Sequence, residues 1–207
     1  MQERNARPEP DLLELDVTAP ASNRRWAADF SYVRIWAGFG YVPFAIGGFS
    51  HAMVGWHPSG TMTTPLVTMT LRIALWTRER AGRPATYGLN DHSDAGAQGG
   101  FASVSFAEIP KLEGFAASIG SIGDAEDSAL SESSIGLFKT GAMRNDSPFR
   151  SSPLRQLANV TWVTAEWVDW YNARRLHSTL GSVPPEDFEA PCCAHLETPQ
   201  DPVLALA

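Results

Sequence analysis

The sequence contains little cysteine and no long apolar run. Its two cysteines, Cys192 and Cys193, are adjacent, which disfavours a disulfide between them, and no spaced set of Cys and His predicts a zinc site. No stretch of about 18 apolar residues predicts a membrane-spanning helix. The charged first residues lack the apolar segment of a signal peptide. We therefore expect a cytoplasmic protein that does not contact a membrane.

Basic residues are also scarce. The 207 residues include 16 Lys and Arg against 23 Asp and Glu, a formal net charge of −7, which by itself argues against a nucleic-acid partner. The charge is unevenly distributed, because residues 139–175 carry a local charge of +3. Acids gather elsewhere, where bound divalent cations would offset their charge. They include Asp91, Asp94, Asp124, Glu126, Asp127 and Glu132.

Length and composition predict one globular domain with short tails. Apolar residues make up 43% of the chain and charged residues 19%. The first segment is rich in Pro and acids, and the character changes at Trp26. We predict a flexible leader at 1–22, a catalytic-type core at 23–145, a C-terminal helical extension of the core at 146–190, and a tail at 191–207.

Local patterns predict an α/β protein. Runs of aromatic and β-branched residues predict strands, and apolar residues at helical spacing predict helices. The expected order is strands at 26–36, 39–46 and 51–57, a helix from Pro65 to Gly82, a strand at 85–90, a helix at 103–113, a strand at 115–119, and helices at 124–140 and 154–177. The first helix is expected to have Thr64 as its N-cap and to carry Leu66, Met69, Ile73 and Trp76 at helical spacing.

Short links between the first three strands predict an antiparallel meander. The later strands alternate with helices, which predicts a mixed five-stranded sheet with helices on both faces. This order is similar to that of the ribonuclease H-like fold. We expect Pro43 to lie on an edge strand, because proline cannot donate to a sheet ladder. We also expect Trp162, Trp167 and Trp170 to be core residues.

Three carboxylates are candidate metal ligands. Asp29 lies inside the first strand, Asp94 follows the fourth strand, and Glu132 lies on the helix after Asp124. Carboxylates from two strands and a helix can converge at one sheet edge, where they would hold one or two magnesium ions. Each residue taken singly also has a structural interpretation: a hydrogen-bonded strand residue, a turn residue and a solvated helix residue.

Four blocks of sequence carry a more specific signal. They are NRRWAADFSYVRIWAGFGYV, HSDAGAQ, GDAEDSALSESSIGLFK and WVDWYNARRLHSTLGSVPPEDFE, in that order between Asn23 and Glu189. Together they resemble the second-frame (orfB-type) transposase of a large family of bacterial insertion sequences. Members of that family belong with the retroviral integrases and carry an Asp-Asp-Glu triad on the ribonuclease H-like fold.

The resemblance implies roles for individual residues. Asp29, Asp94 and Glu132 match the triad and would bind Mg²⁺ or Mn²⁺, two ions when DNA is bound. The implied reactions are DNA cleavage at transposon ends and transfer of the freed 3′-hydroxyl onto target DNA. Lys139, Arg174, Arg175 and His177 are candidate DNA contacts, with a solvated helix face as the alternative for the arginines and a structural role for His177.

The resemblance also implies partners. These are transposon and target DNA, and further copies of the chain in an active multimer, so the protein would associate with the nucleoid when bound to DNA. The family's upstream helix-turn-helix region, or first-frame protein, is expected to be missing from this chain.

Some positions depart from the family's pattern. Gly47-Gly48 and His51 stand where an Asp, a bulky apolar residue and an Arg are usual, and Gly99-Gly100 follows Gln98 where a Tyr is usual. Two alternatives therefore stay open beside an active enzyme: a truncated, catalytically degenerate remnant, and a DNA-binding regulator with the same fold.

Overall fold

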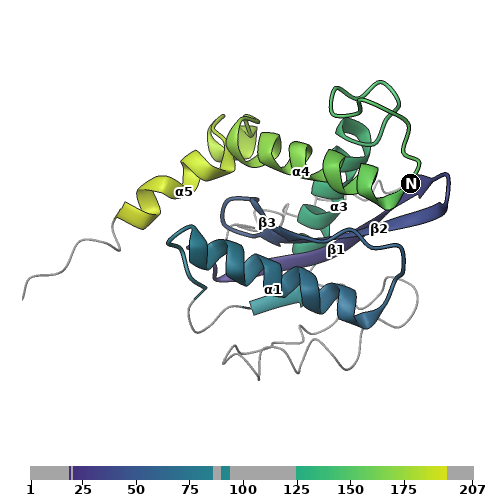
Figure 1. Ribbon diagram of the computed structural model, residues 1–207. Helices are drawn as coiled ribbons and strands as arrows, with labels where there is room; N and C mark the ends of the chain where they lie inside the picture. Colours follow the sequence, from purple (N-terminus) through teal and green to yellow (C-terminus); the bar gives the residue numbers. More distant parts are fainter. Residues whose placement is uncertain (1–18, 20, 86–89, 94–124, 195–207) are drawn as a thin grey trace, which may run out of the picture.

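The computed structural model describes residues 19, 21–85, 90–93 and 125–194 (Figure 1). The strands are β1 (Arg25–Ile35), β2 (Gly38–Gly47), β3 (Met53–Trp56) and β4 (Asn90–Ser93). The helices are α1 (Thr64–Arg80), α3 (Ala125–Gly141), α4 (Leu157–Ala173) and α5 (Pro185–Ala194), with a short 3₁₀ turn at Ser178–Leu180.

The four described strands form one sheet in the order β3-β2-β1-β4. β1, β2 and β3 are antiparallel neighbours, and β4 runs parallel to β1. The predicted meander followed by a parallel strand is therefore confirmed. The fourth strand is described at 90–93, and residues 86–89 of the predicted strand lie outside the described residues. The predicted helix at 103–113 and fifth strand at 115–119 lie outside the described residues.

The β1–β2 hairpin is long and tightly turned. Its connection is Trp36-Ala37, and Gly38 has a φ of +127°, a conformation that residues with a side chain rarely adopt. The Trp36 amide donates a hydrogen bond to the Leu154 carbonyl at 3.1 Å. The tip of the hairpin is thus fixed to the segment that leads into α4.

The sheet is covered on both faces, as predicted (Figure 1). On one face α3 and α4 pack against β1 and β2 around a chain of aromatic rings. Phe44 lies 4.9 Å from Phe138 between ring centroids, and Phe138 lies 5.2 Å from Trp167. On the other face α1 packs closely on β3, where a Cβ on Gly55 would lie 2.6 Å from Ala74 Cβ.

Several details of the sequence-based prediction were wrong. The last predicted helix, at 154–177, ends at Ala173, and α5 was not predicted. β2 is not an edge strand, because it lies between β3 and β1, although its pairing with β3 starts at Phe44 and leaves Pro43 outside that ladder. Trp162 is 63% exposed on α4, whereas Trp167 is buried. The N-cap of α1 is Thr63, one residue earlier than expected.

Helical spacing located α1 but not its buried face. Leu66 is buried, yet Met69 and Trp76 are 45% and 58% exposed. The helix turns Leu71, Ala74 and the long stem of Arg78 inward instead. Apolar residues occur on several sides of this helix, so only packing against β3 decides which side is buried. No helix among the described residues is long and apolar enough to cross a membrane.

Candidate functional site

Asp29 lies in the middle of β1, on the face of the sheet that α3 and α4 cover. Side chains alternate between the faces of a strand, and Ala27 belongs to the core cluster on that face. Asp29 pairs with Phe44, whose ring contacts Phe138 of α3. The half-buried carboxylate accepts a hydrogen bond at Oδ1 from the Phe30 amide, at 2.7 Å. An acid at a core-facing strand position is a candidate for function.

Asp94 lies outside the described residues, but the strand before it is described. β4 runs parallel to β1 with Ala28 opposite Ser93. Asp29 directly follows Ala28, and Asp94 directly follows Ser93. The parallel register therefore ends immediately before the second candidate carboxylate.

Glu132 is exposed on α3, beside the helix face that packs on the sheet. That face carries the buried Ser131, Ile135 and Phe138, and α3 contacts β1 directly. Asp29 and Glu132 therefore lie on two elements that touch. Within residues 21–85, 90–93 and 125–194, no three His, Cys, Asp or Glu side chains form a group suited to a metal ion, and the third candidate, Asp94, is not among them.

Lys139 lies two helical turns beyond Glu132. Its Nζ is 5.2 Å from the ring centroid of Tyr32, a cation–π contact that holds the C-terminal part of α3 beside β1. The side chain is exposed. Its charge is thus presented to solvent at a fixed place on the surface.

The three candidate DNA contacts after α4 have different surroundings. Arg174 is exposed and forms an ion pair with Asp169. The guanidinium of Arg175 lies 5.6 Å from the ring centroid of Trp170. His177 is buried, with its ring edge-on to Tyr171 at 4.7 Å. We do not keep the DNA-contact prediction for His177, because its ring does not face solvent.

The environment of His177 also affects its charge. Burial lowers the pKa of this imidazole, although the nearby Tyr171 carbonyl acts in the opposite direction. The positive charges of Arg175 and His51 lower the pKa further. The ring is therefore a neutral packing group at pH 7, which agrees with the structural alternative for this residue.

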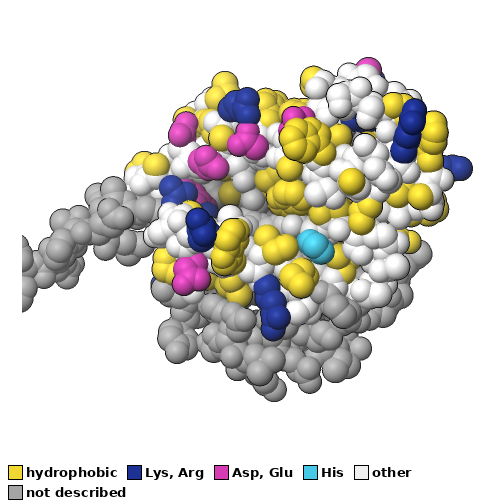
Figure 2. All heavy atoms as spheres, viewed as in Figure 1, with side chains coloured by type: hydrophobic (Ala, Val, Ile, Leu, Met, Phe, Trp, Pro, Cys, Tyr) yellow, Lys and Arg dark blue, Asp and Glu magenta, His cyan; other side chains and the backbone are white. Residues whose placement is uncertain are grey.

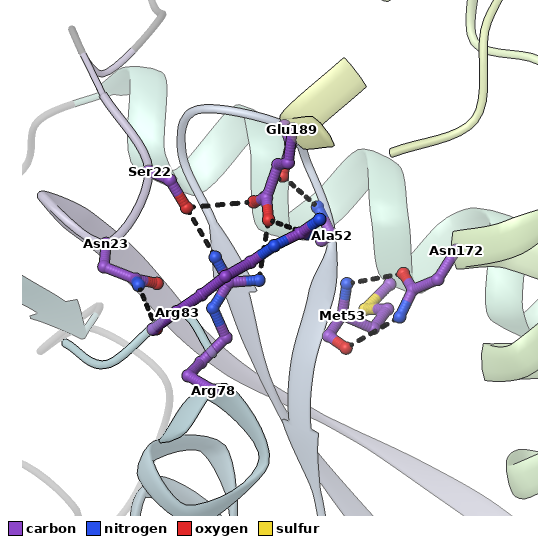
Figure 3. Close-up of polar contacts among 9 residues, drawn as sticks. Ser22, Asn23, Ala52, Met53, Arg78, Arg83, Asn172 and Glu189 are labelled. Carbon is purple, nitrogen blue, oxygen red and sulfur yellow. Dashed lines mark hydrogen bonds and ion pairs between the residues drawn. The ribbon is translucent and has the colours of Figure 1, made fainter. Parts of the chain in front are cut away.

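Sequence reasoning missed a buried ionic cluster around Glu189 of α5 (Figure 3). Its carboxylate accepts hydrogen bonds from Ser50 Oγ at 2.6 Å, Arg78 Nη1 at 2.7 Å and Arg83 Nη1 at 2.9 Å, and from Ser22 Oγ. Glu189 is 2% exposed. The only sequence signal was its place in the fourth block, because no spacing rule links it to arginines more than 100 positions away.

The Glu189 cluster is charged despite its burial. Burial alone acts to raise the pKa of this carboxyl group. The Arg78 charge, the hydrogen bonds from Ser50 and Arg78, and the Arg83 charge together hold the pKa below its ordinary value. The cluster fastens α5 to α1 and to the β2–β3 turn, so its role is structural.

Asn172, another polar residue of the fourth block, also has a structural role. Its Oδ1 accepts a hydrogen bond from the Met53 amide at 2.9 Å, and its Nδ2 donates one to the Met53 carbonyl at 3.0 Å. Both bonds join α4 to β3 (Figure 3). Asn172, His177 and Glu189 of this block therefore position the last helices.

Comparison with known proteins gives one family and one fold. The family model that matches the chain describes an integrase core domain and covers residues 113–185. The chain is 38% identical over 194 residues to the putative transposase for insertion sequence element IS986/IS6110 of Mycobacterium tuberculosis, an alignment that covers 94% of this chain and 67% of that protein.

A second relative is the transposase for insertion sequence element IS629 of Shigella sonnei. It is 39% identical over 179 residues, covering 86% of this chain and 56% of that protein. Among solved structures, the HTLV-2 integrase catalytic core domain in complex with magnesium, in its trimeric form, matches with a TM-score of 0.57 and 16% identity, covering 82% of this chain and 98% of that one. The likeness to the HTLV-2 core concerns the fold, which is ribonuclease H-like.

Proposed function

The chain belongs to the bacterial insertion-sequence transposases with an integrase core domain, and we propose that it is the catalytic core that cuts DNA at transposon ends and joins the freed ends to target DNA. The observation that carries the proposal is the position of Asp29 on β1, one residue beyond the pairing with β4 and on the sheet face that α3 covers. This is the point at which carboxylates from all three elements would meet.

We propose that Asp29, Asp94 and Glu132 form one cluster. The parallel register of β1 and β4 supports this for the two aspartates, because Ala28 and Ser93 are paired and each directly precedes one of them. The packing of α3 on β1 supports it for Glu132. Two strands and a helix would then contribute one carboxylate each.

The donor set fits a hard divalent cation. All three candidates are carboxylates, which are oxygen ligands of the type that Mg²⁺ and Mn²⁺ prefer. Asp29 is half-buried and Glu132 is exposed at the edge of the α3–β1 contact, so one side of such a cluster stays open to a DNA phosphate. When bound, a pair of such ions activates the attacking oxygen and stabilises the leaving one.

The protein's own groups would position the DNA. The carboxylates would fix the place of the reacting phosphate, and Lys139, two turns beyond Glu132, would contact a neighbouring phosphate. Arg174 and Arg175 remain candidate backbone contacts, of which Arg174 would first have to leave Asp169. In this scheme no side chain becomes covalently attached to DNA, because water or a 3′-hydroxyl is the nucleophile.

The proposal is tested by Glu132→Gln, which removes a ligand charge and keeps the side chain's size. We expect strand transfer of a labelled transposon end, with Mg²⁺ or Mn²⁺, to fall by at least about 100-fold, because this class of catalysis depends on ligand charge and geometry. Glu166 is an exposed glutamate on a different helix, α4, so Glu166→Gln is the matched control and should retain activity. Activity that survives Glu132→Gln would reject the proposed role.

The remnant and regulator alternatives predict instead that wild type itself carries out no strand transfer. The departures at Gly47 and Gly48 motivate them, but the β2–β3 turn is well formed around these glycines. Gly47 is paired with Trp26, and the Gly48 amide donates to the Arg25 carbonyl at 2.9 Å.

We also propose that the active form is a multimer, as the trimeric HTLV-2 core illustrates for its fold. Sedimentation of the protein with and without DNA tests this.

A further inference from the structure

A cavity of about 710 Å³ lies where β1 ends, outside the proposed carboxylate cluster. Its walls come from the second half of β1, the hairpin tip, the end of α3 and the segment that follows α3. Tyr32, Trp36, Lys139 and Arg150 are among the residues that line it. The volume lies in the range of small-ligand sites, about 300–1,000 Å³. We call it the hairpin pocket.

The hairpin pocket has a basic lining, although the protein as a whole is acidic. Arg34, Lys139 and Arg150 line it, and none of its described lining residues is an Asp or Glu. The whole chain, in contrast, has a net charge of −7. Figure 2 shows basic and hydrophobic side chains together at the end of the molecule where the β1–β2 hairpin lies, whereas acidic side chains gather over α4 and α5. This distribution favours an anionic ligand in the pocket.

Large aromatic side chains are exposed at the same place. Trp36 is 72% exposed, Tyr32 is 58% exposed and Phe39 is 49% exposed. The guanidinium of Arg155 lies 4.7 Å from the Trp36 ring centroid, and Lys139 lies over Tyr32. Each cation holds its ring in place on one side. Exposed rings grouped with cations are typical of surfaces that stack bases and bind the adjoining phosphates.

We propose that the hairpin pocket binds single-stranded DNA, stacking an unpaired base on Trp36 or Tyr32 and holding its phosphates with Lys139, Arg150 and Arg34. A duplex hides the base faces in its own stack, whereas a single strand offers them. The proposal rests on the proposed function only in that DNA is the substrate.

The position of the pocket suits the reacting strand. Tyr32 follows Asp29 by three strand residues, and Lys139 follows Glu132 by seven helical residues, about 10 Å in each case. The Tyr32 side chain lies on the opposite face of β1 from Asp29, and Lys139 of α3 reaches its ring. Both walls of the pocket therefore continue the two elements that would carry the carboxylates. A strand whose phosphate reacts at the carboxylates would reach the pocket with a nearby unpaired nucleotide.

The test is fluorescence anisotropy with a labelled oligothymidylate about 15 nucleotides long and with a duplex of equal length. Wild type is compared with Trp36→Leu and Lys139→Gln. Trp162→Leu is the matched control, because Trp162 is 63% exposed on α4, away from the pocket lining. Binding is measured in EDTA, where no metal-dependent reaction takes place, so the result does not depend on the proposed catalysis.

We expect Trp36→Leu to raise the single-strand Kd roughly tenfold, the order of one lost stacking contact, with a much smaller effect on the duplex. Lys139→Gln should weaken binding and flatten its dependence on salt. The proposed binding of single-stranded DNA in the pocket would be overturned if Trp36→Leu and wild type had equal single-strand affinity, or if Trp162→Leu lost as much affinity as Trp36→Leu. Neither result would affect the Glu132 test. If wild type bound the single strand as expected but carried out no strand transfer, that result would count only against the proposed catalysis.

Discussion

At the Glu189 carboxylate, four donors meet in the protein interior. A buried charge is stable only when its partners replace the water it has lost, and two arginines and two serines do so here. The side chain belongs to α5, whereas its partners come from the entry to β1, the β2–β3 turn and α1 with the segment after it (Figure 3). One residue therefore joins distant parts of the chain.

Replacing Glu189 with Gln should be costly. The substitution keeps the shape but leaves Arg78 and Arg83 without a buried counter-charge, so we expect the free energy of unfolding to fall by about 3 kcal/mol. Urea denaturation followed by circular dichroism measures this. Glu186→Gln, an exposed glutamate on the same helix, is the control and should change stability by less than about 0.5 kcal/mol. Equal effects of the two variants would contradict the structural role of Glu189.

The same carboxylate predicts a dependence on pH. Its pKa in the folded protein lies below the ordinary value of 4.5, so the unfolded chain binds this proton more readily. The stability that Glu189 contributes is fully present above pH 4.5 and is lost as the pH falls through the folded pKa. In Glu189→Gln this part of the acid destabilisation should be absent, which a denaturation series below pH 5 would show.

At the scale of elements, the contact of α1 with β3 depends on one glycine. A Cβ on Gly55 would lie 2.6 Å from both the Thr70 carbonyl oxygen and Ala74 Cβ. These are backbone and near-backbone atoms that cannot move aside cheaply. Close approach of a strand to a helix thus explains why a residue without a side chain stands in this strand.

Gly55→Ala should therefore destabilise the protein by about 2 kcal/mol, because the added methyl overpacks the α1–β3 contact. Gly136→Ala is the matched control. Gly136 lies in α3, where an added Cβ would have no neighbouring atom within 4 Å, so the same change there should stabilise the helix by about 0.5–1 kcal/mol. Opposite shifts of the melting temperature are expected. A neutral Gly55→Ala would show that α1 and β3 are less closely packed.

At the scale of the whole molecule, the proposed metal site links three separate segments. Asp29, Asp94 and Glu132 stand on β1, directly after β4, and on α3. A ligand that binds the folded state at such a junction stabilises it by mass action. Metal binding should therefore be visible as a gain in global stability, apart from any reaction.

We expect Mg²⁺ or Mn²⁺ at a concentration well above its Kd to raise the melting temperature of wild type by several degrees, since about 1 kcal/mol corresponds to 2–4 °C in a domain of this size. Asp94→Asn should abolish the shift, and EDTA should reverse it. The measurement is repeated with a DNA end present, whose phosphates complete the metal shell. No shift in either condition would favour the degenerate remnant over the enzyme.

Much of the fold followed from local patterns. Alternating and helical periodicities located the meander, α1, α3 and α4 to within a few residues, because backbone preference and periodicity are properties of neighbouring residues. The same patterns misjudged the buried face of α1, the exposure of Trp162 and the place of β2 in the sheet. Those depend on what packs against each element, which local sequence does not record.

The sequence by itself determined the family, the order of β1 to β4, α1, α3 and α4, and the three carboxylate candidates, because the blocks that carry them are short and contiguous. Only the tertiary structure decided that Asp29 faces the helix-covered side of the sheet, that His177 is enclosed, and that Glu189 meets two arginines. It alone also brought Trp36 and Lys139 to one pocket. These contacts join residues far apart in the chain, and their energy arises from burial and charge pairing that exist only once the chain has folded.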